Sequence, residues 1–123
     1  MPKPKFTRLK LSRAARRELL DIAKWTFKEF GRAALLRYDA LILQALIEID
    51  RDPCLPGSRE LPKSLGSGIR TYHIALSKSK VKGDKVDSPR HVIVYRQLKD
   101  GKIEIINIIH EARDLSRHLP KNF

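Results

Sequence analysis

Two β-rich runs joined by Asp100-Gly101 limit the folds open to this chain more than any other feature. The runs cover His91–Leu98 and Lys102–Ile109, and an Asp-Gly pair between such runs predicts a hairpin closed by a type I′ turn. The segment Ile103–Ile109 is apolar at nearly every position. This pattern is typical of a strand buried on both faces, so we expect it in the interior of a sheet.

Two amphipathic helices are predicted before the hairpin, over Arg13–Phe30 and about Arg32–Asp50. Ser12 can cap the first helix, and Gly31 separates the two. Pro53 ends the second helix, because the residue before a proline avoids the helical region. Helices joined by so short a connection form an antiparallel hairpin, which must bury its apolar stripes on another element. We expect this helical hairpin on one face of the sheet.

Two further strands are predicted, over Lys5–Leu11 at a sheet edge and over Ile69–Leu76 directly before the β-hairpin. The order of elements is then β-α-α-β-β-β. Three successive strands with hairpin-type connections form an antiparallel meander. The sequence therefore predicts an α+β fold, in which an antiparallel sheet carries the helical hairpin on one face and a short C-terminal helix follows.

The segments between these elements are predicted as loops. Asp52–Ser67 is rich in proline, glycine and serine, which is typical of a surface loop. Ser77–Ser88 is basic and has no periodicity, so we expect a mobile loop within a loop insertion at 77–90. In the basic segment His110–Leu119 the apolar residues have helical spacing, and Pro120 ends the expected C-terminal helix.

Length and charge bound the class of protein. We expect a single domain over residues 1–123, with residues 1–4 disordered. The formal net charge of +12 indicates a polyanionic partner, which could be nucleic acid, a nucleic-acid enzyme, an anionic membrane or an acidic protein. No apolar run approaches the roughly 20 residues that cross a bilayer, so no membrane-spanning segment is expected, and of these partners a membrane is the one we do not expect. A lone Cys54 excludes an internal disulfide and fits a cytoplasmic protein.

The sequence carries no motif for a metal or another cofactor. Its histidines, which are His73, His91, His110 and His118, lack a tight ligand spacing. Metal-free RNA cleavage would need a base, an acid and cations, and the candidate residues are His110, Arg113, His118, Arg96 and Tyr95. Each candidate also has a structural interpretation. Tyr95 fits the core, His110 fits a hydrogen-bonded strand end, and Arg113 can pair with Asp114.

Four short segments of the C-terminal half carry a family resemblance. They are Val92-Ile93-Val94-Tyr95-Arg96, Asp100-Gly101, Ile103-Glu104-Ile105 and His110-Glu111-Ala112-Arg113-Asp114-Leu115. Together with an early helix containing Ala14-Ala15, they make the chain resemble the RelE/ParE toxins of type II toxin–antitoxin systems. The resemblance extends from about Lys5 to Leu119 and is closer to the ParE branch. It implies the same β-α-α-β-β-β fold.

The resemblance implies a toxin that inhibits DNA gyrase, binds an acidic antitoxin in a hetero-oligomer and is not itself an enzyme. The first alternative is a RelE-like, ribosome-dependent mRNA endoribonuclease. Arg113 matches one arginine of such ribonucleases, but Val92 stands where they place another. The second alternative is a basic nucleic-acid-binding module without toxicity. The expected target-binding residues are Arg96, His110, Arg113 and Arg117.

Overall fold

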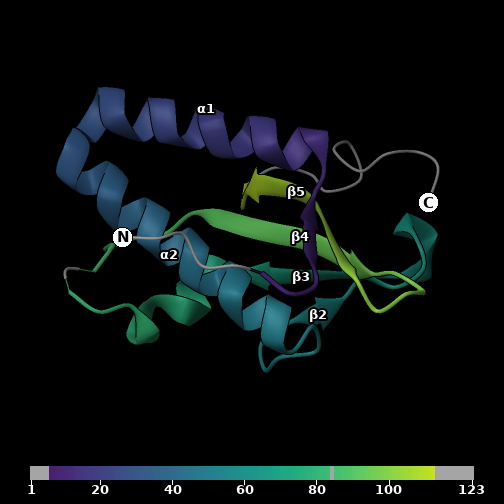
Figure 1. Cartoon of the computed structure of the whole chain (residues 1–123). Helices are drawn as coiled ribbons and strands as arrows, with labels where there is room; N and C mark the ends of the chain where they lie inside the picture. Colours follow the sequence, from purple (N-terminus) through teal and green to yellow (C-terminus); the bar gives the residue numbers. More distant parts are fainter. Residues whose placement is uncertain (1–5, 84, 113–123) are drawn as a thin grey trace.

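The computed structural model describes residues 6–83 and 85–112. Within these residues, two long helices and five strands, with two 3-10 helices, follow one another (Figure 1). Their bounds are β1 Leu9–Leu11, α1 Arg13–Phe30, α2 Arg32–Arg51, β2 Arg59–Glu60, η1 Lys63–Leu65, β3 Ile69–His73, η2 Ile74–Lys80, β4 His91–Gln97 and β5 Ile103–His110. Both long helices were predicted, because Ser12 and Gly31 mark their starts and their apolar stripes are regular.

The strands form one sheet in the order β1-β5-β4-β3-β2. β5 therefore lies inside the sheet, as predicted, and Ile103 and Ile105 are fully buried. The predicted α+β fold class is confirmed, with one correction. β1 lies at an edge but runs parallel to β5, so the sheet is mixed and not wholly antiparallel. Its direction was not fixed by any hairpin, because the helix pair separates β1 from every other strand.

The β4–β5 hairpin forms where it was predicted, but the predicted type I′ turn was wrong. That turn needs a positive φ at Asp100, and no described residue other than glycine has one. Instead Leu98 N donates to Lys102 O at 2.7 Å, and Gly101 N donates to Leu98 O at 3.0 Å. The loop thus has three residues, and Gly101 takes the left-handed position with φ 84°.

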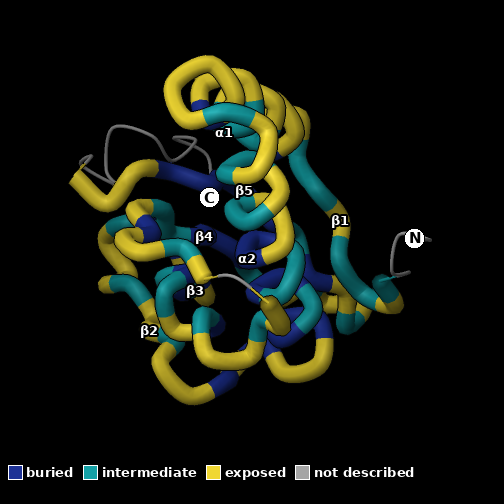
Figure 2. The backbone as a smooth tube through the Cα atoms, turned by 90° about the vertical axis from the view of Figure 1, so that its left-hand side faces the viewer, coloured by how far each residue is buried: buried dark blue, intermediate teal, exposed yellow. Residues whose placement is uncertain are grey.

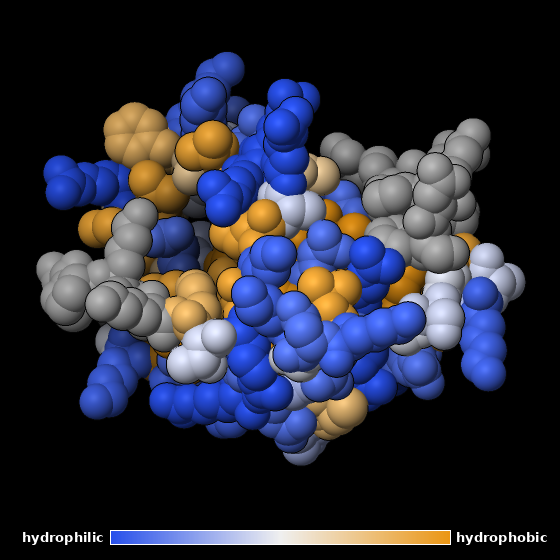
Figure 3. Space-filling view, turned by 45° about the vertical axis from the view of Figure 1, so that its right-hand side comes forward, coloured by the Kyte–Doolittle hydropathy of each residue, from blue (hydrophilic) through white to orange (hydrophobic). Residues whose placement is uncertain are grey.

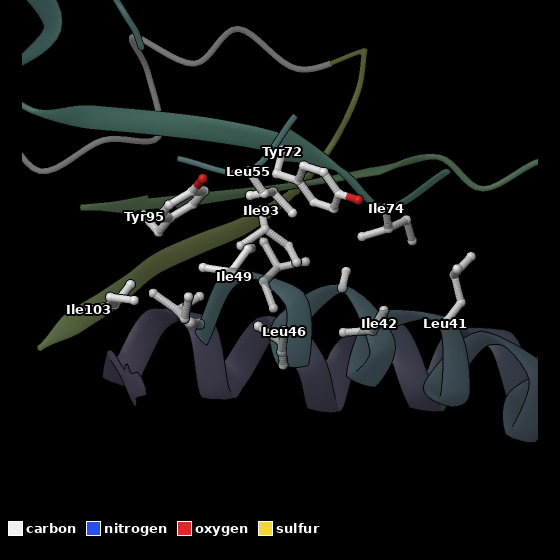
Figure 4. Packing of buried hydrophobic residues seen from close by; sticks show 14 residues of the cluster. Leu41, Ile42, Leu46, Ile49, Leu55, Tyr72, Ile74, Ile93, Tyr95 and Ile103 are labelled. Atoms are coloured by element: carbon white, nitrogen blue, oxygen red, sulfur yellow. The ribbon is translucent and has the colours of Figure 1, made fainter. Parts of the chain in front are cut away.

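The helices cover one face of the sheet (Figure 1). Figure 4 shows side chains of α2, among them Leu46 and Ile49, packed toward Ile93 and Tyr95 of β4. The exposed outer side of α1 contrasts with the buried strands β4 and β5 in Figure 2. Buried apolar residues on one face of a sheet explain why the helical hairpin packs there. Within the described residues, no helix combines the length and the apolar character that a membrane crossing requires.

Two predicted loops contain regular structure. In the segment Asp52–Ser67, the short strand β2 pairs with β3, and Leu61 and Leu65 pack on the sheet face opposite the helices. The strand β2 was not predicted, because a strand of two residues is too short to give a recognisable sequence pattern. The second core cluster on that face combines these leucines with Ile69, Val92, Val94, Ile106 and Ile109.

The predicted strand over Ile69–Leu76 and the predicted mobile loop from Ser77 were both partly wrong. β3 ends at His73, where η2 begins, and η2 packs on α2. The Ser77 side chain is fully buried and donates to the carboxylate of Glu48 on α2, which also binds Lys80. Glu48 lies on α2, far from this segment in the sequence, so the periodicity of the segment itself could not reveal the contact.

Candidate functional site

Three histidines lie at one end of the sheet. His73 ends β3, His91 begins β4 and His110 ends β5. Because β3, β4 and β5 are antiparallel to their neighbours in this order, these three positions fall at the same end of the sheet. His91 is directly opposite His110 in the register, and their rings meet edge to face with centroids 5.6 Å apart. We call this group, with the residues that contact it, the sheet-end cluster.

Tyr38 of α2 ties the helix pair to this cluster. Its hydroxyl lies 2.5 Å from His91 Nδ1 and accepts a hydrogen bond from Arg90 N at 3.0 Å. Burial raises the pKa of Tyr38, although the Arg90 N–H opposes this, so the hydroxyl keeps its proton at neutral pH. That proton is available to His91 Nδ1, so the Tyr38 hydroxyl donates to the ring while it accepts from Arg90 N.

Glu111 joins two other members of the cluster. Its Oε2 lies 2.7 Å from His73 Nε2, and its Oε1 accepts from Arg90 Nη1 at 2.9 Å. The hydrogen bonds from His73 and Arg90 lower the pKa of Glu111, so it remains ionised at neutral pH. The charge of Arg90 is thus partly neutralised. His110 is exposed, and its Nδ1 accepts from Ala112 N at 3.1 Å.

Replacing Tyr38 with phenylalanine should lower the free energy of unfolding by about 1–2 kcal/mol, because His91 Nδ1 and Arg90 N both lose a partner. Urea denaturation measures the change. Ser79→Ala is the matched control, since it also removes one hydroxyl, but from an exposed residue. Equal stability of the two variants would contradict the role given to the Tyr38 hydroxyl.

The structure separates the residues predicted for the site. Arg96 lies near the end of β4 that is remote from the sheet-end cluster and from His110. Its guanidinium pairs with Glu104 at 3.1 Å. Tyr95 is fully buried and donates to Pro53 O at 2.6 Å, as its predicted core position requires. The other predicted residues, Arg113, Arg117 and His118, lie outside the described residues, as does most of the predicted C-terminal helix.

The sequence interpretation missed most of the sheet-end cluster. A two-residue hairpin centred on Asp100-Gly101 places His91 directly opposite His110, so that pair could have been found. The actual loop of three residues moves the register by one, and the register shift between Val94 and Tyr95 restores this pairing. Tyr38 carried no such signal, because it is one of several apolar-stripe residues on α2.

A cavity of about 660 Å³ opens between the sheet-end cluster and the corner where α1 meets α2. Its apolar wall consists of Trp25, Phe30, Ala34 and Val86. Its polar rim includes Arg37, Tyr38, Arg90, His91 and His110. Hydrophobic surface among hydrophilic residues is visible at the upper left of Figure 3, on the side of the molecule where the helices meet.

Most polar side chains of the sheet-end cluster already have a hydrogen-bond partner within the described residues. Within residues 6–83 and 85–112, no three His, Cys, Asp or Glu side chains are placed to hold a metal ion. His91 and His110 each already use Nδ1, and Arg90 pairs with Glu111. A metal-free nuclease needs a cation to stabilise the phosphorane in addition to an acid and a base.

A family model matches most of the chain, and a solved structure shares its fold. Residues 9–115 match the family model described as the ParE toxin of type II toxin–antitoxin system, parDE. A solved structure titled as the chromosomal ParDE TA system from P. aeruginosa has the same fold, with a TM-score of 0.61 and 18% identity. The alignment covers 85% of this chain and 96% of that one. No curated protein matches. Because the family model spans most of the sequence, the chain belongs to the ParE toxin family of type II toxin–antitoxin systems.

Proposed function

We propose that this ParE-family toxin inhibits DNA gyrase and that an acidic antitoxin neutralises it. Membership of a paired toxin–antitoxin family implies an antitoxin partner. The observation that carries the proposal is the family match over residues 9–115, which includes the segment from His110 to Leu115 that resembles the ParE branch. The net charge of +12 supports an acidic partner, since opposite charges speed encounter and favour the correct complex.

The target-binding surface is proposed to include Arg113 and Arg117, with His110 beside them in sequence. His110 is exposed at the end of β5 and so is accessible to a macromolecule. Arg96 is a weaker member, because its guanidinium pairs with Glu104 and would have to leave that carboxylate to bind a target.

The competing function is a ribosome-dependent ribonuclease, and the proximity of His91 and His110 is the observation in its favour. Two observations oppose it. Val92 stands where such ribonucleases place an arginine, and it packs with the apolar cluster on the face opposite the helices. Tyr95, which could have taken part in acid–base chemistry, is buried with its hydroxyl bound to Pro53 O.

Induced expression in bacterial cells tests the proposal. We expect growth to stop, plasmid DNA from the arrested cells to lose negative supercoiling, and growth to resume when the neighbouring antitoxin gene is also expressed. Inhibition of gyrase removes the activity that introduces negative supercoils, whereas cleavage of mRNA leaves plasmid topology unchanged at first. Arrest with normal supercoiling and cut mRNA would support the ribonuclease instead.

A further inference from the structure

Large aromatic side chains are exposed where α1 meets α2. Trp25 is 57% exposed and Phe30 is 64% exposed, and their rings meet edge to face with centroids 5.4 Å apart. Neighbouring large apolar side chains on a surface mark an interaction site more often than isolated ones do. Tryptophan in particular is enriched among the residues that dominate binding energy. The packing of the fold gives no reason for these two rings to be exposed to solvent.

The two rings form one wall of the 660 Å³ cavity beside the sheet-end cluster. Its volume lies within the roughly 300–1,000 Å³ of pockets that enclose a ligand. The rings are inclined at 75°, so they form a corner and not a parallel pair of faces. A corner of this shape suits a branched or aromatic side chain, whereas stacking of a nucleobase favours a flat face on each side.

The charged side chains that line the cavity are mostly cationic. They are Arg37, Lys85 and Arg90, and among the described lining residues Asp87 is the one acid close to them. Arg90 already binds Glu111. Arg37 is half-buried, and within the described residues no hydrogen bond or ion pair engages its side chain. An arginine in this state can bind a carboxylate without first giving up a partner.

We propose that this cavity docks an acidic protein segment, which inserts one large apolar side chain against Trp25 and Phe30 and sets a carboxylate on Arg37. The inference rests on the proposed function for the identity of the segment, which is part of the antitoxin. It assigns the neutralising contact to the helix corner, in a cavity whose rim includes His110, one of the proposed target-binding residues. Charge complementarity and the apolar wall together define the occupant.

The fluorescence of Trp25 tests this directly, because it is the single tryptophan of the chain. The probe is the product of the gene next to the toxin gene, in a variant whose own tryptophans are replaced by phenylalanine. On formation of the complex, we expect the emission of Trp25 to shift to shorter wavelength and its quenching by acrylamide to fall several-fold. Both changes report that an exposed indole has become buried.

Paired variants locate the contact. Arg37→Glu should weaken antitoxin binding about tenfold or more, whereas Arg59→Glu should change it by less than about threefold. Arg59 is an exposed arginine on the edge strand β2 and does not line the cavity, so the change of charge is matched. Phe30→Ala should also weaken binding, and its control is Leu76→Ala, since Leu76 is 50% exposed at another site. Thermal melting confirms that each variant folds.

The outcomes separate the inference from the proposed function. A complex in which Trp25 stays exposed overturns the docking site and leaves the antitoxin proposal intact. Failure of the neighbouring product to bind the toxin at all overturns both. Quenching of Trp25 by a single-stranded oligonucleotide, with no response to the antitoxin, would instead assign the cavity to nucleic acid.

Discussion

Replacing Asp50 with alanine is expected to destabilise the fold by about 2–4 kcal/mol, because this carboxylate holds β1 onto the C-terminal end of α2. Its Oδ2 accepts from Thr7 N and Thr7 Oγ1, both at 3.1 Å. Its Oδ1 accepts from Arg8 N at 2.8 Å and from Leu9 N at 3.1 Å. Asp50 is buried, so alanine would leave several backbone N–H groups without a partner and with little water to replace it.

Urea denaturation of Asp50→Ala, Asp50→Asn and Asp39→Ala measures the effect. Asp39 is an exposed acid on the same helix, so its replacement controls for loss of negative charge. Asparagine keeps one acceptor oxygen and should fall between the other two variants. If Asp50→Ala is as stable as Asp39→Ala, β1 is held by its pairing with β5 alone.

The same carboxylate should make stability depend on acid pH. Burial by itself would raise the pKa of Asp50, but the hydrogen bonds from Arg8, Thr7 and Leu9 outweigh burial and hold the pKa below its ordinary value. Its contribution to stability is therefore complete above the ordinary pKa of 3.8 and is lost as the pH falls through the lower folded value. Asp50→Asn should flatten this acid limb of the stability curve.

Replacing Arg113 and Arg117 together with alanine is expected to abolish growth inhibition while antitoxin binding persists. Both residues lie outside the described residues, and the proposal rests on the match of Arg113 to a family position and on its place three residues after β5. Cations anchored near a buried strand lose less conformational freedom on binding than cations on a free chain. Colony counts after induction measure toxicity, and co-purification measures antitoxin binding.

Lys99→Ala with Lys102→Ala is the matched control, since it also removes two cations, from exposed positions at the β4–β5 turn. Lys80 is unsuitable as a control because it binds Glu48 in the folded protein. If Arg113 only pairs with Asp114 to fix the tail, Asp114→Ala should be equally damaging and both should lower the melting temperature. Toxicity that is lost in the lysine variant and kept in the arginine variant would place the functional surface elsewhere.

The sheet centre was predictable because the information is local. Isoleucine at nearly every position of Ile103–Ile109 indicated burial on both faces, and Asp100-Gly101 fixed the position of the hairpin. The type of turn could not be predicted in the same way. In the structure Leu98 and Lys102 close a loop of three residues, and the sequence pattern does not tell which two residues close the loop. The resemblance added the family, which the comparison confirms.

The candidate site was less predictable because its contacts are distant in sequence. Tyr38 and His91 meet across 53 positions, and Glu111 reaches His73 across 38. Ser77 was predicted to lie in a loop, yet it is buried and donates a hydrogen bond to a carboxylate of α2. Such contacts depend on how elements pack and not on periodicity within one element.

A supercoiling assay tests the central proposal most directly. Purified toxin is added to DNA gyrase and relaxed plasmid, with and without the antitoxin, and a parallel reaction follows an mRNA under translation. We expect supercoiling to fall as toxin is added, to recover when antitoxin is present, and the mRNA to stay intact. Undiminished supercoiling together with cleavage of the translated mRNA would contradict the proposal and identify a ribonuclease.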